Sequence, residues 1–136
     1  MEIHLPADCG NAPRIGIVNA VLVAWASGDR EAVSVWLAED VEWNVVGGAT
    51  YQGRRSVLQT LPEVRPDTLA IHSTISHGRH AACDATLTFS GQRSGGHAGP
   101  SEAGSTSLSV MVRFTSAAAR TGRIASVRAY VVKGAP

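Results

Sequence analysis

The chain has few cysteines, little net charge and no long apolar run. Its two cysteines, Cys9 and Cys83, among 136 residues are too few for a disulfide framework and lack the spacing of metal ligands, so we expect free thiols. The formal net charge is +1, so nothing indicates the basic surface that nucleic acids or anionic membranes require. No segment approaches the roughly 20 apolar residues of a transmembrane helix. The composition therefore predicts no nucleic-acid partner and no membrane partner.

The N-terminal segment does not resemble a secretory signal. Residues 1–14 contain Glu2, Asp8 and two prolines, with no apolar core, and we expect a tail there and a cytoplasmic protein. The hydrophobic fraction of 44% and a mean hydropathy of +0.03 suit one globular domain, which we place at residues 15–133.

The first half of the chain reads mainly as helices. The apolar run 15–27 follows Pro13, and Gly28-Asp29 ends this helix and caps a second one over residues 30–37. Alternation over residues 41–45 predicts a short strand, and a third helix over residues 54–61 follows Gly53.

The second half reads as strands. Apolar and polar residues alternate over 68–75, 81–89, 108–114 and 124–131, which predicts an antiparallel sheet buried on one face. Helices followed by strands indicate an α+β fold. The Gly/Ser-rich segment 91–105 exceeds the usual hairpin loop of about 2–5 residues. It is either a flexible insertion or a lid over a pocket.

Several short motifs, in this order and spacing, resemble the nuclear transport factor 2-like superfamily, and within it the SnoaL-like and ketosteroid-isomerase-like branch. They are Gly28-Asp29, the segment from Ala38 to Trp43, Gly53-Arg54-Arg55, Gly122-Arg123-Ile124 and Arg128-Ala129-Tyr130. The resemblance implies a cone-shaped α+β barrel, with three N-terminal helices packed on a strongly curved, mixed and mainly antiparallel sheet. It also implies a pocket on the concave face and a homodimer through the convex face.

The resemblance also indicates where catalytic groups would lie. The carboxylate base, tyrosine and aspartic acid of the isomerases correspond to Val45, Val21 and Val110. An aspartate of the related epoxide hydrolases corresponds to Ala129. Aliphatic side chains cannot transfer protons, so neither mechanism is expected in its usual form.

Three other residues are weak candidates for acid–base chemistry. They are Asn44 beside the position of the base, His77 in the inward phase of Ile75, and Asp84 in the second long strand. Alternation directs Asp84 outward, although a shift of one residue in register would reverse this. His72, His77 and His80 differ in phase, so we predict no metal site, and nothing indicates a cofactor.

The expected pocket is apolar. Any one tryptophan could instead be a core residue. The predicted lining consists of Val21, Trp25, Trp43, Val45, Ile71, Cys83, Ala85, Val110, Val112, Ala129 and Val131.

Three functions remain open. The first is a dimeric binding module for a small, largely hydrophobic or aromatic molecule. The second is a cyclase- or isomerase-type enzyme of polyketide, steroid or other small-molecule metabolism that uses non-standard residues. The third is a structural or regulatory partner whose pocket is filled by its own side chains.

Overall fold

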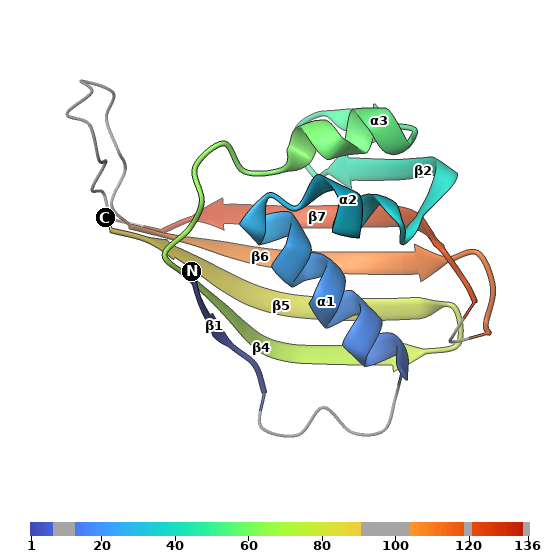
Figure 1. Ribbon diagram of the computed structural model, residues 1–136, viewed down its shortest axis with the longest axis horizontal. Helices are drawn as coiled ribbons and strands as arrows, with labels where there is room; N and C mark the ends of the chain where they lie inside the picture. The colour runs from blue at the N-terminus through green and yellow to red at the C-terminus, as the bar shows by residue number, and fades with distance from the viewer. Residues whose placement is uncertain (7–12, 91–103, 119–120, 135–136) are drawn as a thin grey trace.

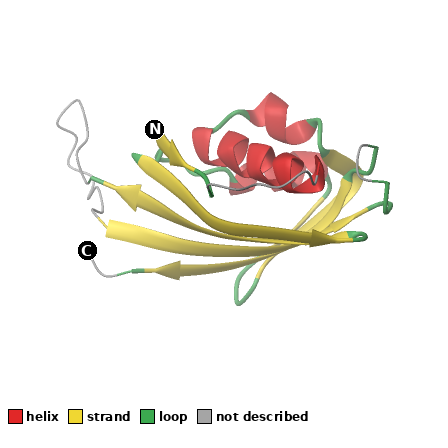
Figure 2. Cartoon of the chain, turned by 90° about the horizontal axis from the view of Figure 1, so that it is seen from below, coloured by secondary structure: helices red, strands yellow, loops and turns green. Residues whose placement is uncertain are grey.

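Seven strands form one sheet in the computed structural model, which describes residues 1–6, 13–90, 104–118 and 121–134. Helices cover one face of this sheet (Figures 1 and 2). In chain order the elements are β1 (Glu2–His4), α1 (Pro13–Ser27), α2 (Arg30–Ser34), β2 (Leu37–Val45), β3 (Thr50–Gln52), α3 (Arg54–Val57), the 3-10 turn η1 (Leu58–Thr60), β4 (Thr68–His77), β5 (His80–Phe89), β6 (Gly104–Phe114) and β7 (Ile124–Lys133).

The strand order is β1-β4-β5-β6-β7-β2-β3. The β1–β4 and β2–β7 pairs are parallel and the other four pairs are antiparallel. This arrangement confirms a mixed, mainly antiparallel α+β fold, consistent with the cone expected from the resemblance.

Two finer features of the predicted fold are not confirmed. The sheet is not strongly curled; alternation specifies which face of a strand is buried but contains no measure of curvature. The helices are not all N-terminal either, because α3 and η1 follow β3.

The ends of the sequence-predicted elements also shift. The predicted tail contains a strand, β1, in which Glu2–His4 pair with Thr68, Leu69 and Ala70 of β4. The second helix ends at Ser34; Leu37, predicted to be helical, begins β2 and is fully buried. Of the predicted loop 91–105, residues 91–103 lie outside the described residues, and β6 begins at Gly104.

Local chemistry explains the turns between the helices and the first strands. Asp29 caps α2, and its carboxylate accepts a hydrogen bond from the Ala32 amide at 3.1 Å. Gly53 precedes α3 with φ 88° and ψ 155°, a backbone conformation that is essentially restricted to glycine.

The core lies between α1 and the inner face of the sheet. α1 contributes Val18, Val21 and Leu22, and the strands contribute alternate residues such as Ala85 and Val110. No helix in the described ranges is long and apolar enough to cross a membrane.

A buried arginine fastens the start of α1 to two loops at one end of the sheet. The Arg14 guanidinium donates to the carbonyls of Gly78 (2.9 Å), Ser116 (3.1 Å) and Ala118 (2.8 Å). Its central carbon lies 4.0 Å from the centroid of the Phe114 ring. The side chain is 3% exposed, so its charge is stabilised by carbonyl dipoles and an aromatic face.

Candidate functional site

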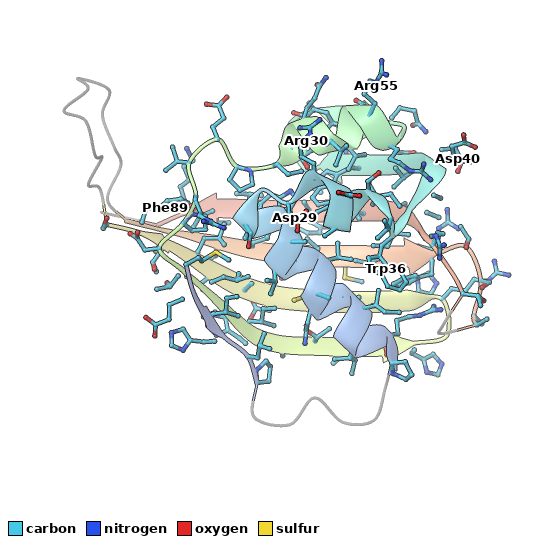
Figure 3. All side chains as sticks on the ribbon, viewed as in Figure 1. Asp29, Arg30, Trp36, Asp40, Arg55 and Phe89 are labelled. Atoms are coloured by element: carbon cyan, nitrogen blue, oxygen red, sulfur yellow. The ribbon has the colours of Figure 1, made fainter. Side chains whose placement is uncertain are left out.

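A cavity of about 420 Å³ lies at the other end of the sheet, where β5 and β7 end and β6 begins. The segment that follows η1 passes over this end, and Phe89 lies there at the end of β5 (Figures 1 and 3). The volume falls within the roughly 300–1,000 Å³ that is usual for small-molecule sites. The lining consists of Trp25, Trp43, Val45, Tyr51, Gln59, Thr60, Pro62, Glu63, Val64, Leu87, Phe89, Thr106, Leu108, Ala129, Val131 and Lys133.

Aromatic side chains gather at this cavity. The chain has three Trp, two Tyr and two Phe, and four of these seven residues line it: Trp25, Trp43, Tyr51 and Phe89. The rings of Trp25 and Trp43 are stacked, with centroids 6.2 Å apart and planes inclined by 18°. They come from α1 and β2, so the contact between helix and sheet also forms one aromatic wall of the cavity.

A short hydrogen-bond chain fixes this wall. The Trp25 indole N–H donates to the Thr60 hydroxyl at 3.1 Å, and that hydroxyl donates to the Val57 carbonyl at 2.7 Å. Both donors are therefore in use within the protein. The remaining polar lining residues are Tyr51, Gln59, Glu63, Thr106 and Lys133.

The predicted pocket residues divide into two groups. Trp25, Trp43, Val45, Ala129 and Val131 line the cavity. The other six are buried in the core and are not part of its lining: Val21, Ile71, Cys83, Ala85, Val110 and Val112.

Eleven of the sixteen residues that line the cavity are absent from the predicted lining. The segment from Gln59 to Val64 supplies five lining residues, and Tyr51 lies on β3, a strand with no clear alternation. Leu87 and Leu108 had a usable signal, because both lie in the inward phase of long strands.

None of the three weak catalytic candidates lines the cavity. Asp84 is exposed on the outer face of the sheet, defined here as the face opposite the helices, between Ser73 and Ser109. The Asn44 side-chain amide donates a hydrogen bond to the Thr50 hydroxyl at 2.7 Å.

His77 is exposed, contrary to its predicted inward phase. The β4–β5 register shifts between Ile71 and Ser73. One extra residue at such a bulge reverses the faces of all later side chains. Ser73, Ile75 and His77 therefore point outward, whereas Thr74 points inward.

This reversal creates a polar contact inside the core. The Thr74 hydroxyl donates to Asn19 Oδ1 at 2.6 Å and lies 3.4 Å from Cys83 Sγ. Burial raises the pKa of the Cys83 thiol, the hydrogen bond with Thr74 opposes this, and the nearby Asp84 charge adds to it. A buried neutral thiol is a poor nucleophile, which favours a structural role for Cys83.

Within the described ranges, no group of three or more His, Cys, Asp or Glu residues could hold a metal ion. The His72 Nε2 atom forms a hydrogen bond with the Thr86 hydroxyl at 2.8 Å. His77 lies opposite His80 across the β4–β5 hairpin.

A model of the SnoaL-like domain family matches residues 18–127. No curated protein matches the chain.

Solved structures share the fold at low sequence identity. A protein from Kribbella flavida, proposed to be a ketosteroid isomerase, is 16% identical with a TM-score of 0.67, covering 91% of this chain and 81% of its own. An NTF2-like protein of unknown function from Burkholderia xenovorans is 14% identical with a TM-score of 0.66, covering 91% and 86%. A protein from Xanthomonas campestris, proposed to be a polyketide cyclase, is 20% identical with a TM-score of 0.63, covering 87% and 89%.

Proposed function

Given that the chain belongs to the SnoaL-like domain family of the nuclear transport factor 2-like superfamily, we propose that its cavity binds a small, largely apolar or aromatic molecule. The observation that carries this proposal is the gathering of four of the seven aromatic residues around one cavity. Aromatic rings bury large areas and stack against flat ligands. An apolar cavity with a few polar groups is the usual form of a small-molecule site.

The residues at the family's catalytic positions support binding without acid–base catalysis. Val45 and Ala129 line the cavity, at positions where the resemblance places a carboxylate in the isomerases and in the epoxide hydrolases. Val21 and Val110, at the other two positions, are buried in the core. Because His77, Asp84 and Asn44 lie outside the cavity lining, they give no support to the alternative of a cyclase- or isomerase-type enzyme.

The proposal is tested by titrating the protein with 3-phenylpropan-1-ol, a neutral probe with one ring, in a calorimeter. Val131 lines the cavity, whereas its neighbour Val132 is 64% exposed and is absent from the lining. In Val131→Phe the added ring occupies part of the cavity. Excluding about 55 Å² of apolar probe surface at about 25 cal/mol per Å² costs ~1.4 kcal/mol, which is a tenfold loss of affinity.

Val132→Phe is the matched control and should bind as the parent does. Saturable binding by the parent, weakened by Val131→Phe alone, supports the proposal. Binding that neither variant changes would place the probe elsewhere, and no binding at millimolar concentration would refute a site of this kind.

The homodimer and the cytoplasmic location stay predictions. A homodimer through the outer face agrees with its exposed apolar side chains: Ile75, Met111, Tyr130 and Val132 are 66%, 49%, 40% and 64% exposed. Sedimentation of the parent at the mass of a monomer would contradict the dimer. The cytoplasmic location is likewise untested.

A further inference from the structure

The two charged residues on the cavity lining differ in their contacts with the rest of the protein. The lining has two charged residues, Glu63 and Lys133. Lys133 already has an interaction of its own. Glu63 is exposed, and within the described ranges its carboxylate makes no hydrogen bond or ion pair. The Glu63 carboxylate is therefore a charged group of the lining that no described residue pairs.

The position of Glu63 is set by the segment that covers the cavity. Glu63 lies between Pro62 and Val64, which also line the cavity, and Pro66 at the end of this segment is fully buried. Two prolines restrict the backbone of this short connection between η1 and β4. Glu63 thus lies on a restrained segment that lines the same cavity as the aromatic residues.

We infer that the molecule bound in this cavity is an organic cation, with its ammonium group near Glu63 and its apolar body against Trp25, Trp43, Tyr51 and Phe89. This inference rests on the proposed function and specifies the class of its ligand. Aromatic faces attract cations through the ring quadrupole, most strongly in Trp. A carboxylate and an aromatic wall at one site therefore favour the same sign of ligand charge.

Two donors of the lining point the same way. The Trp25 N–H and the Thr60 hydroxyl, which could otherwise bind an anion, are already donated to Thr60 and to the Val57 carbonyl. An anionic ligand would meet the Glu63 charge without these two donors to compensate.

The test compares three probes that share one body and differ in charge: 3-phenylpropylammonium, 3-phenylpropan-1-ol and 3-phenylpropanoate. Titrations at low salt should give an affinity for the ammonium about fivefold above that of the alcohol, on the scale of a partly exposed ion pair with an aromatic contribution. The carboxylate should bind more weakly than the alcohol. The preference should shrink as sodium chloride is raised, because salt screens exposed charges.

Glu63→Gln keeps the shape of the side chain and removes its charge. This variant should lose most of the preference for the ammonium while it keeps its affinity for the alcohol. Glu31→Gln is the matched control, since Glu31 is an exposed residue of α2 that is absent from the lining, and it should behave as the parent does.

The outcomes separate this inference from the proposed function. Equal binding of ammonium and alcohol, a preference that survives Glu63→Gln, or tighter binding of the carboxylate would each overturn the cation and leave the cavity as a binding site. Failure of all three probes would overturn both.

Discussion

Replacement of Arg14 by Met should destabilise the fold strongly, because Arg14 connects α1 to both loops at its end of the sheet. Met keeps most of the apolar stem but removes three hydrogen bonds, to the carbonyls of Gly78, Ser116 and Ala118. It also removes the contact between the guanidinium and the Phe114 ring at 4.0 Å.

The size of the loss depends on how far water replaces the hydrogen bonds that Arg14 makes. Hydrogen bonds to a charged group contribute about 1.5–3 kcal/mol each, but Gly78 and Ala118 are exposed residues whose carbonyls water can reach in the variant. The desolvation of the buried guanidinium offsets a further part of the stabilisation by these hydrogen bonds. We therefore expect a loss of about 2–4 kcal/mol in the free energy of unfolding, equivalent to roughly 10 °C in Tm for a domain of this size.

Urea unfolding, followed by tryptophan fluorescence, measures this loss. Arg30→Met is the matched control, since Arg30 is exposed and its contact with the Leu58 carbonyl is a long one of 3.5 Å. This change should cost less than about 0.5 kcal/mol. If Arg14→Met also costs less than 0.5 kcal/mol, the three bonds and the ring contact do not stabilise the fold, and the reasoning is wrong.

Three further predictions concern stability. Thr60→Val leaves the Trp25 indole N–H without its acceptor and should cost about 1 kcal/mol in urea unfolding; no loss would show that water replaces the hydroxyl. Gly53→Ala forces a side chain into φ 88° and should cost about 1–3 kcal/mol, whereas Gly16→Ala in α1, where nothing lies within 4 Å, should stabilise by about 0.5–1 kcal/mol. Because the pKa of Cys83 is raised in the folded state, the folded protein holds its thiol proton where the unfolded chain has lost it. Stability should thus fall as pH rises above the ordinary thiol pKa of about 8.5, and less steeply in Cys83→Ala; equal slopes would contradict the pKa shift.

The sequence predicts the fold well where alternation is continuous. Residues 81–89 and 124–131 lie within β5 and β7, and buried and exposed positions alternate along most of β6 as expected. Alternation fails in β4, because the bulge between Ile71 and Ser73 falls in the polar stretch His72-Ser73-Thr74. The next apolar residue, Ile75, keeps the phase of Ile71 in the sequence although it points outward. This one shift accounts for the wrong inward placement of His77.

The site is predicted less well, for a different reason. Trp43, Val45 and Ala129 could be placed because they are inward residues of strands, and strand phase is readable from sequence. Glu63 and Tyr51 belong to a connection and to a three-residue edge strand. Tyr51 is placed by the pairing of β3 with β2, where it lies opposite Trp43. Glu63 is placed by the way in which the segment after η1 folds back over the sheet. No local pattern encodes either arrangement.

The central claim is that the cavity beside Trp25 and Trp43 binds a small apolar or aromatic molecule. Its most direct test is the NMR spectrum of the three tryptophan indole N–H groups during titration with 3-phenylpropan-1-ol. Trp25 and Trp43 line the cavity, whereas Trp36 does not and has Arg123 at 5.8 Å from its ring. The predicted result is that the Trp25 and Trp43 signals shift saturably while the Trp36 signal does not shift. Three unmoved signals, or a shift of Trp36 alone, would contradict the claim.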